Sequence, residues 1–307
     1  MMIQENSKQK QSHDPPVEMI KARKTDLLSG CLYRAVRIFG MLPMPLLYGL
    51  SRLAYLWMFH LFAYRKMVVI QNICRSFPEK KYGEIKRIVE GFYRSFCDHI
   101  AEILKSVSAS PLQQKEKIEL IDFEQIRHQI ALGRHVIAGM GHCGNWEILN
   151  VIPFILDMKA YAIYKPLSTK CMDSLLLKIR SRFGMSLITD KSVARHLMTN
   201  ENPSLYFILA DQCPAGIDET PRIHFLHQST RVFWGIEKLA RKTNAGVFYL
   251  HVIQTSRGRY RVECKEISTN ASCTGEEEIT RCYLRLLEQN IHEYPSGWLW
   301  SHKRWKR

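Results

Sequence analysis

A histidine and a glutamate lie five residues apart in the stretch GMGHCGNWEIL, residues 139–149. An imidazole held in one orientation by a carboxylate can act as a general base at neutral pH and remove a proton from a hydroxyl group. The carboxylate fixes the tautomer of the imidazole and stabilises its protonated form. The spacing therefore predicts His142 as a base and Glu147 as its partner, with the hydroxyl of a substrate as the nucleophile.

The residues around this pair suit a tight turn between a strand and a helix. Gly141 and Gly144 allow the backbone to turn sharply and a substrate to approach closely. Asn145 is expected to cap a helix that begins near Trp146. Glu147 would then lie in the first helical turn and face back toward His142.

Three other uses of this stretch compete with a histidine base. Cys143 follows His142 directly, but adjacent side chains rarely point at one another, which disfavours a thiol nucleophile. A metal site needs more ligands at fixed spacing, and the HExxH pattern is absent, so we predict no metal. The third alternative is a core histidine with a surface glutamate, which the H-x4-E spacing alone leaves open.

The charge balance favours acidic partners. The chain has 307 residues, enough for one large domain or two modest ones, and a formal net charge of +15. Such an excess suits anionic lipid, an acidic protein or nucleic acid. No nucleic-acid motif is recognisable, so nucleic acid is not an expected partner. The nine cysteines form no CxxC pair and are expected to be reduced thiols in a cytosol-facing protein.

The N-terminal part of the chain divides into a tail and an apolar segment. Residues 1–20 are polar, lack the apolar core of a signal peptide and are predicted to be a disordered tail. Residues 21–66 are predicted to be a membrane-associated helical anchor. Residues 41–64 are long enough to span a bilayer, but Arg52 near their centre is costly there. One tilted span and helices lying in the interface both remain open, as does a buried helical hairpin of a soluble protein.

Residues 67–307 show the alternation of an α/β domain. Apolar positions at helical spacing predict a helix over residues 81–107. Strand patterns follow at 135–140, 161–165, 204–211, 222–226, 245–253 and 259–267, with helical patterns at 145–155, 169–183, 191–200, 231–243 and 275–292. The order predicts an α/β fold with a mixed sheet flanked by helices. In such sheets functional groups gather where strands end. Residues 139–149 lie at the end of the first of these predicted strands.

Five blocks of the sequence, in order, resemble one known family. GHCGNWE at residues 141–147 resembles the H-x4-D/E block of glycerolipid and lysophospholipid acyltransferases, and more narrowly the HxGNWE form in the late acyltransferases of lipid A biosynthesis, the lauroyl and myristoyl transferase group. The other blocks are QNICRSFPE (71–79), YAIYKPL (161–167), LADQCPAG (209–216) and WLWSHKRWK (298–306). The resemblance covers the chain from about residue 27 onward and implies a glycerolipid acyltransferase-like fold.

The resemblance implies O-acyl transfer from an acyl thioester, usually of acyl carrier protein, to a hydroxyl of a lipid A precursor. His142 would be the base and Glu147 its partner, with no dissociable cofactor. Lysine 165 stands where the family commonly has arginine, and lysine offers a point charge instead of a bidentate fork. The substrate-binding residues that we predict from these blocks and from the basic stretch after the DQ block are Asn145, Lys165, Asp211, Gln212 and Arg231.

The C-terminal residues 297–307 interleave tryptophan with lysine and arginine, a pattern typical of membrane interfaces. We therefore expect Trp298, Trp300 and Trp305 near the headgroups, anionic membrane lipid and a glycolipid acceptor as partners, and acyl carrier protein as the acidic donor. The expected location is the cytoplasmic face of the inner membrane. The alternatives are another lipid acceptor (a lysophospholipid, an aminolipid or another glycolipid) and a non-catalytic membrane-surface binding protein.

Overall fold

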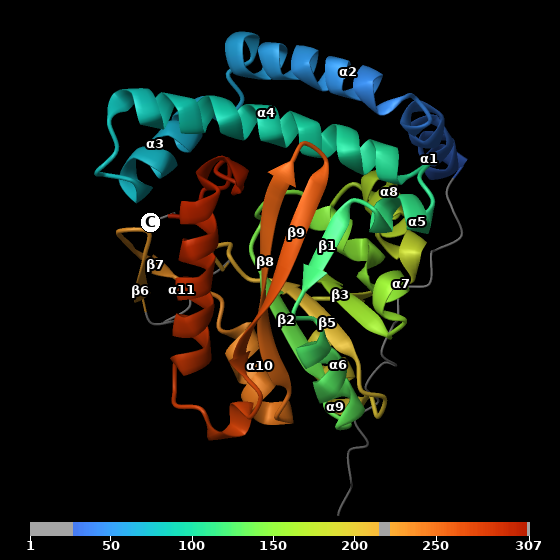
Figure 1. Ribbon diagram of the computed structural model, residues 1–307, viewed down its shortest axis with the longest axis vertical. Coiled ribbons are helices and arrows are strands. Elements are labelled where there is room, and N and C mark those ends of the chain that lie inside the picture. Colours follow the sequence, from blue (N-terminus) through green and yellow to red (C-terminus); the bar gives the residue numbers. More distant parts are fainter. Residues whose placement is uncertain (1–26, 215–221, 306–307) are drawn as a thin grey trace, which may run out of the picture.

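The computed structural model describes residues 27–214 and 222–305. The predicted tail, residues 1–20, lies outside the described residues. The centre of the molecule is a seven-stranded sheet in the order β1-β9-β8-β2-β5-β3-β4 (Figure 1). All neighbouring pairs are parallel except β8 and β9, which are antiparallel. The predicted α/β fold with a mixed sheet flanked by helices is therefore confirmed.

The strands of this sheet are short except for the β8–β9 hairpin. Their bounds are β1 Ile118–Ile121, β2 Val136–Met140, β3 Ala160–Tyr164, β4 Ser186–Thr189, β5 Leu205–Leu209, β8 Gly246–Ser256 and β9 Arg259–Ser268. The sequence patterns located β2, β3, β5, β8 and β9 but missed β1 and β4. These two edge strands have four residues each, too few for a clear alternation.

Both faces of the sheet are buried, and each has its own apolar core. Because side chains alternate along a strand, Val136 and Ala138 of β2 pack into one core and Ile137 packs into the other. Helices α6 (Glu124–Ala131) and α7 (Ile152–Leu156) supply the first core. Helices α9 (Val193–Thr199), α10 (Gly235–Thr243) and α11 (Glu278–Glu293) supply the second.

A long helix, α4 (Tyr82–Ser106), lies across one end of the sheet, as Figure 1 shows. It confirms the helix predicted over residues 81–107. Ile85, Ile88, Val89 and Phe92 lie on its buried face. Helix α4 contacts α1 (Leu27–Gly40), α2 (Met44–Leu56) and α3 (Lys66–Ser76) on its other sides. It therefore joins the N-terminal helices to the core of the sheet.

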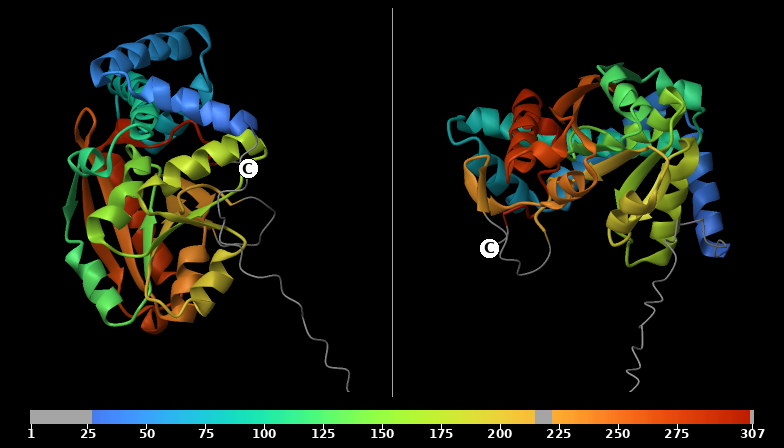
Figure 2. Two further views of the ribbon diagram at one scale, coloured as in Figure 1. Left: turned by 90° about the vertical axis from the view of Figure 1, so that its right-hand side faces the viewer. Right: turned by 90° about the horizontal axis from the view of Figure 1, so that it is seen from below.

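Helix α2 lies at one end of the molecule, outside α4 (Figure 2). Helix α2 continues into a π-helical turn, Trp57–Leu61. The remaining α-helices are the short α5 (Pro111–Lys115) and α8 (Lys170–Arg180). Among the described residues, no single helix is long and apolar enough to cross a membrane. One pair, Met44–Leu61 and Lys66–Ser76, bent by 89°, meets the length and composition requirement together.

The strand predicted over residues 222–226 does form, but it lies outside the main sheet. Strands β6 (Arg222–Phe225) and β7 (Gln228–Arg231) make a separate antiparallel hairpin. Arg222 and His224 are exposed, whereas Ile223 and Phe225 are buried. A strand with only one apolar face fits such a hairpin better than the interior of a sheet that is covered on both faces.

Trp298 and Trp300 are buried and Trp305 is partly buried, so the predicted place of Trp298 and Trp300 at a membrane interface is wrong. Trp298 and Trp300 are 2% and 0% exposed, and Trp305 packs against the same core. The Trp300 ring contacts the Trp298 and Phe77 rings, and its Nε1–H donates to the carbonyl of Pro295. The alternation of aromatic and basic residues could not distinguish a membrane surface from a segment that turns back into the core.

Candidate active site

Three of the predicted site residues follow the carboxyl ends of neighbouring parallel strands. His142 comes two residues after β2, Asp211 two residues after β5, and Lys165 directly after β3. Because β2, β5 and β3 are adjacent and parallel, these residues meet at one edge of the sheet. Ligand sites of α/β folds lie at this edge.

His142 is held by a carboxylate that the sequence analysis assigned to substrate binding. Its ring Nδ1 lies 2.6 Å from Oδ1 of Asp211. The Oδ2 atom of Asp211 accepts the backbone N–H of His142 at 3.0 Å and the indole N–H of Trp298 at 2.7 Å. With Nδ1–H donating to the carboxylate, the neutral ring presents Nε2 as a proton acceptor. This is the tautomer that a general base requires.

Asp211 is 2% exposed and is ionised in its setting. Burial by itself would raise the pKa of this carboxyl group. The charge of the His142 ring and the hydrogen bonds from His142 and Trp298 oppose burial and lower the pKa of Asp211 to about 2. A permanent carboxylate therefore stands behind the imidazole.

The other side of the His142 ring is the accessible one. The side chain keeps 14% of its surface exposed, and its Nε2 lies 3.4 Å from the amide nitrogen of Gln212. The Trp146 ring meets the His142 ring edge-on, with 4.8 Å between centroids. Gln212 and Trp146 thus flank the nitrogen that would take a proton.

Glu147 has different partners from the one that its spacing predicts. Its carboxylate accepts two hydrogen bonds at 3.0 Å from Nε of Arg180, a further one from Nη2 of Arg180, and one at 2.9 Å from Asn150. Burial would raise the pKa of Glu147, but the Arg180 charge and these bonds lower it, with a smaller contribution from His142. Glu147 lies in a 3-10 helix, residues 146–151. The two parallel N–H groups of the Arg180 guanidinium match a carboxylate better than one imidazole nitrogen can.

Asn145 precedes that 3-10 helix, but the predicted side-chain cap is absent from it. Asn145 is buried and makes no hydrogen bond to the helix that follows. Its Nδ2 instead donates to Oε2 of Glu102 on α4, at 2.9 Å. The cap prediction is wrong: a cap would need Oδ1 of Asn145 to accept an N–H of the first turn, whereas the bond from Nδ2 to Glu102 turns this side chain toward α4.

The loop that carries His142 is pinned by the C-terminal segment. The N–H of Gly144 donates to the carbonyl of Gly297 at 2.9 Å, and the N–H of Leu299 donates to the carbonyl of His142 at 3.1 Å. Gly144 has a φ of +57°, which favours glycine. A side chain at Gly141 would place its Cβ 2.4 Å from Leu287, so this glycine is needed for close packing.

The remaining predicted binding residues lie farther out on the structure. Lys165 is exposed, just beyond β3, and Arg231 ends β7, where its carbonyl accepts a hydrogen bond from the buried Arg304 at 2.8 Å. The substrate-binding roles of Lys165 and Arg231 stay predictions. Among the described residues, no group of three or more histidine, cysteine, aspartate or glutamate side chains could hold a metal ion.

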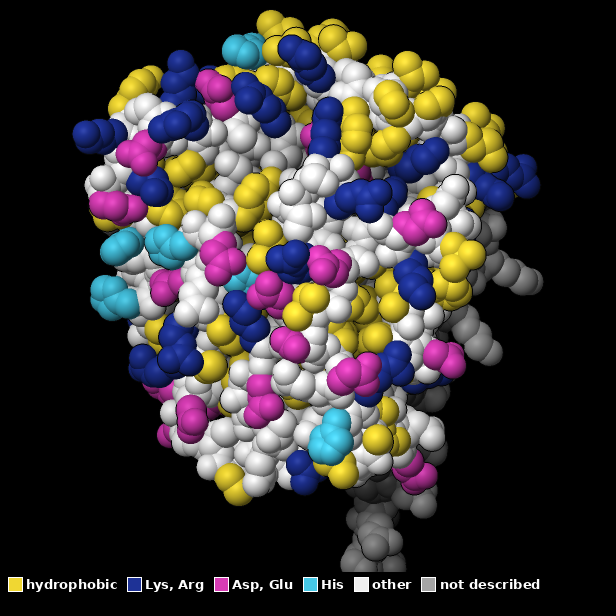
Figure 3. Space-filling view, viewed as in Figure 1, with side chains coloured by type: hydrophobic (Ala, Val, Ile, Leu, Met, Phe, Trp, Pro, Cys, Tyr) yellow, Lys and Arg dark blue, Asp and Glu magenta, His cyan; other side chains and the backbone are white. Residues whose placement is uncertain are grey.

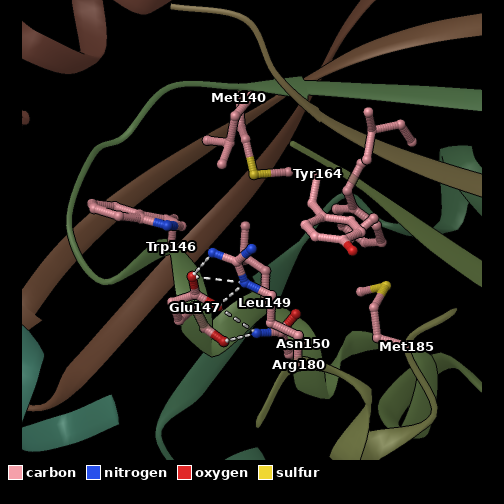
Figure 4. Close-up of a pocket in the computed structure, with 12 residues that line it drawn as sticks. Met140, Trp146, Glu147, Leu149, Asn150, Tyr164, Arg180 and Met185 are labelled. Atoms are coloured by element: carbon pink, nitrogen blue, oxygen red, sulfur yellow. Dashed lines mark hydrogen bonds and ion pairs between the residues drawn. The ribbon is translucent and has the colours of Figure 1, made fainter. Parts of the chain in front are cut away.

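An apolar pocket opens beside the Glu147–Arg180 pair (Figure 4). Its cavity volume is about 50 Å³, and part of it is open to solvent. Figure 4 shows Met140, Tyr164 and Met185 on its apolar side and the hydrogen-bonded Glu147, Arg180 and Asn150 on the other. Trp146 lines this pocket and also contacts the His142 ring, so the pocket lies next to His142.

A buried histidine–aspartate pair with an accessible Nε2, beside an apolar pocket, is suited to acyl transfer. A family model described as bacterial lipid A biosynthesis acyltransferase matches residues 26–307. The chain belongs to this family. It is therefore an acyltransferase, and its family acts in lipid A biosynthesis. No curated protein matches the chain.

Cys143 of this acyltransferase is not placed to be a nucleophile. It is 3% exposed, and burial raises the pKa of its thiol well above the ordinary value, so no thiolate is available. Its backbone forms an isolated bridge with Trp298. The residue next to His142 therefore has a packing role.

Trp298 is the site residue of the acyltransferase whose position the sequence analysis misjudged. Its indole N–H donates to the same oxygen of Asp211 that accepts the backbone of His142. The only signal was its membership in the C-terminal block of the family resemblance. Arg180, which neutralises Glu147, was missed entirely, because nothing in the helical pattern over residues 169–183 distinguishes it from a surface arginine.

Proposed function

We propose that the protein transfers a fatty acyl chain from an acyl thioester, that of acyl carrier protein, to a hydroxyl of a lipid A precursor, with His142 as the general base. The observation that carries this proposal is the His142–Asp211 contact of 2.6 Å, which occupies Nδ1 and leaves Nε2, on the Gln212 side of the ring, as the nitrogen that can accept a proton. The family match supports the acyl transfer and the class of acceptor.

In the proposed reaction, Nε2 of His142 takes the proton of the acceptor hydroxyl while the oxygen of that hydroxyl attacks the thioester carbonyl. Asp211 stabilises the imidazolium that forms. The tetrahedral intermediate then collapses, the carbon–sulfur bond breaks, and the imidazolium returns its proton to the departing thiolate. The products are an ester and a free thiol, and the base is regenerated.

The negative charge on the intermediate needs hydrogen-bond donors close to His142. The amide of Gln212 is a side-chain donor close to the base, because its Nε2 lies 3.4 Å from Nε2 of His142. We propose that this amide contacts the reacting oxygen and that Lys165, at the same edge of the sheet, supplies a positive charge to the substrate. A single donor of this kind contributes roughly 3–4 kcal/mol to the stability of a transition state.

We propose that the apolar pocket of Figure 4 receives the acyl chain. Trp146 lines this pocket and contacts the His142 ring, so an acyl chain bound beside Trp146 would have its carbonyl near the base. Each methylene buried in such a pocket contributes about 0.8 kcal/mol. The depth of the pocket would then set the preferred chain length.

Glu147 acts in this proposal as a positioning residue. With Arg180 it forms one wall of the acyl pocket and fixes the 3-10 helix that carries Trp146. Its carboxylate also interacts electrostatically with His142, as a second negative charge that favours the imidazolium. The predicted partnership of Glu147 with His142 would thus operate through space instead of through a hydrogen bond.

We propose that α1, α2 and the turn after α2 lie in the membrane interface. Figure 3 shows hydrophobic side chains along the upper edge of the molecule, over these helices, with lysine and arginine side chains among them. The exposed apolar side chains of this surface, which we call the α2 face, are Leu46, Leu50, Leu53, Leu56, Trp57, Leu61 and Phe62. An apolar face rimmed by basic residues is typical of interfacial helices.

The same orientation suits the proposed partners. A net charge of +15 attracts both the anionic lipids of the cytoplasmic leaflet and an acidic acyl carrier protein. A location at the cytoplasmic face of the inner membrane follows from that proposal. No dissociable cofactor enters the proposed reaction, because the thioester is itself the activated substrate.

The proposal is tested with purified protein, a lipid A precursor in mixed micelles, and lauroyl or myristoyl thioesters of acyl carrier protein or coenzyme A. The proposal expects ester formation with the carrier-protein donor, loss of at least about 1,000-fold in His142→Ala, and near-normal turnover in the matched control Cys143→Ala. Turnover by His142→Ala at the wild-type rate would refute the role of the base. Turnover with coenzyme A alone would refute the proposed donor.

A further inference from the structure

Glu102, a carboxylate on α4 that takes no part in the proposed reaction, lies at the junction of three elements. Glu102 is 5% exposed. It accepts hydrogen bonds from Asn145 in the His142 loop at 2.9 Å, from Tyr260 on β9 at 2.6 Å and from Tyr48 on α2 at 3.0 Å. Residues far apart in the sequence thus meet on one side chain.

Glu102 has no ion-pair partner within contact distance in the described part of the chain, although Lys117 interacts with it electrostatically. Burial raises the pKa of Glu102, and the three hydrogen bonds only partly offset that effect. A buried carboxyl group without a contacting cation costs stability that an apolar side chain of similar volume would not. Packing alone does not account for glutamate at this position.

The contact with Asn145 gives Glu102 a role close to the site. Asn145 lies three residues after His142, and its Oδ1 atom is buried without a partner in the described structure. Among the described residues, the bond from Nδ2 to Glu102 is therefore the one hydrogen bond that holds this side chain. The loop is fixed by the C-terminal segment at Gly144 and His142, and by Glu102 at Asn145.

We propose that Glu102 is a positioning residue for acyl transfer, which holds the His142 loop through Asn145 so that Nε2 of His142 stays aligned with the reacting centre. This inference rests on the proposed role of His142 as the base. A displacement of about 1 Å in such a group can lower the rate 100-fold. Tyr48 brings α2, which carries the α2 face, onto the same carboxylate.

Asp98 offers a matched control, one helical turn earlier on α4. It also ties α2 to the sheet, through Ser51 at 2.5 Å and Arg257 at 2.6 Å. No contact of Asp98 with the His142 loop occurs among the described residues. A general weakening of the α2–α4 packing would therefore affect Asp98 and Glu102 variants alike, whereas loop positioning would affect Glu102 alone.

The experiment compares Glu102→Met, Glu102→Gln and Asp98→Ala in the full chain by steady-state kinetics with the acyl-carrier-protein donor. Glu102→Met should lower kcat about 10- to 100-fold with the donor KM within about twofold. Glu102→Gln should stay within about threefold, because its amide oxygen can still accept from Asn145. In an Asn145→Ala background, Glu102→Met should lower kcat less than about twofold further, since both changes remove one interaction.

A second readout does not depend on activity. Hydrogen–deuterium exchange of the amides in residues 141–147 should be faster in Glu102→Met than in wild type and unchanged in Asp98→Ala. Where Glu102→Met does not fold, Asn145→Ala removes the same bond from the other partner, and its kcat and exchange must show the loss expected of Glu102→Met.

Wild-type kcat in Glu102→Met, an equal kcat loss in Asp98→Ala, or additive losses with Asn145→Ala would each overturn the inference. If wild-type protein transfers no acyl group, the proposed function fails instead. The exchange measurement then judges Glu102 by itself, and unchanged exchange in Glu102→Met would overturn its positioning role.

Discussion

Replacing Asp211 by asparagine probes the proposed base with a minimal change of shape. In wild type, Oδ2 of Asp211 accepts two N–H groups, from the backbone of His142 and from Trp298, and Oδ1 faces Nδ1 of His142. In Asp211→Asn the amide oxygen must take the Oδ2 position, because an NH₂ group there would face two donors. The NH₂ group then points at Nδ1 of His142.

That arrangement inverts the tautomer of His142. Nδ1 must accept from the new amide, so the proton of the neutral ring moves to Nε2, the atom that should accept the substrate proton. A comparable change in a serine protease triad lowers kcat about 10,000-fold. We expect a loss of about 1,000- to 10,000-fold here, or roughly 4–5 kcal/mol of transition-state stabilisation.

Two assays follow the change. Turnover of a lauroyl or myristoyl carrier-protein donor gives kcat, and ¹⁵N NMR of the histidine ring reports which nitrogen carries the proton. Glu147→Gln is the comparator, because Glu147 contacts Arg180 and Asn150 and not the His142 ring. It should retain the Nδ1–H tautomer of His142 whatever its effect on rate, whereas Asp211→Asn should show Nε2–H.

The reasoning is refuted if Asp211→Asn keeps kcat within about tenfold of wild type. It is refuted equally if Glu147→Gln, and not Asp211→Asn, shifts the proton to Nε2. The second result would return Glu147 to the partnership that its sequence spacing predicts.

Further predictions concern stability, the pocket and the membrane. Arg180→Leu leaves the buried charge of Glu147 unpaired and should lower the free energy of unfolding by about 3–5 kcal/mol in urea titrations, less if Glu147→Gln is added. The folded pKa of Asp211 is lowered to about 2, so its contribution to stability is present above the unfolded pKa and is lost as pH falls. The free energy of unfolding of wild type should therefore fall by roughly 1.5 kcal/mol more than that of Asp211→Asn between about pH 5 and pH 2.5. Ala162→Leu fills part of the acyl pocket and should shift donor preference toward chains shorter by about two methylenes, whereas an unchanged preference would place the chain elsewhere. Leu53→Glu on the exposed α2 face should weaken sedimentation with anionic vesicles without changing the melting temperature; unchanged binding would contradict the interfacial role.

The fold was largely predictable because most of its elements carry a full pattern. Helix α4 has apolar residues at helical spacing over 25 residues, and β2, β5 and β8 are apolar runs buried on both faces. The four-residue edge strands β1 and β4 were missed because so few residues cannot establish a period. The separate position of β6 depends on tertiary contacts that no local pattern encodes.

The sequence predicted most residues of the site but not which of them are hydrogen-bonded to one another. His142, Asp211 and Gln212 come together because they end adjacent parallel strands, which the order of elements implies. Sequence spacing favours the nearest carboxylate, Glu147, over one 69 residues away. Only the folded chain shows that Glu147 is paired with Arg180 and that Trp298, near the C-terminus, donates a hydrogen bond to Asp211.

The central claim is that His142 is the base of an acyl transfer onto a lipid A precursor. Mass spectrometry of membrane lipids tests it most directly, in cells that lack the protein and are complemented with wild type, His142→Ala or Cys143→Ala. The account predicts that wild type and Cys143→Ala restore one acyl chain to a glycolipid, and that His142→Ala leaves the profile of the deletion unchanged. Restoration of that chain by His142→Ala would contradict the account.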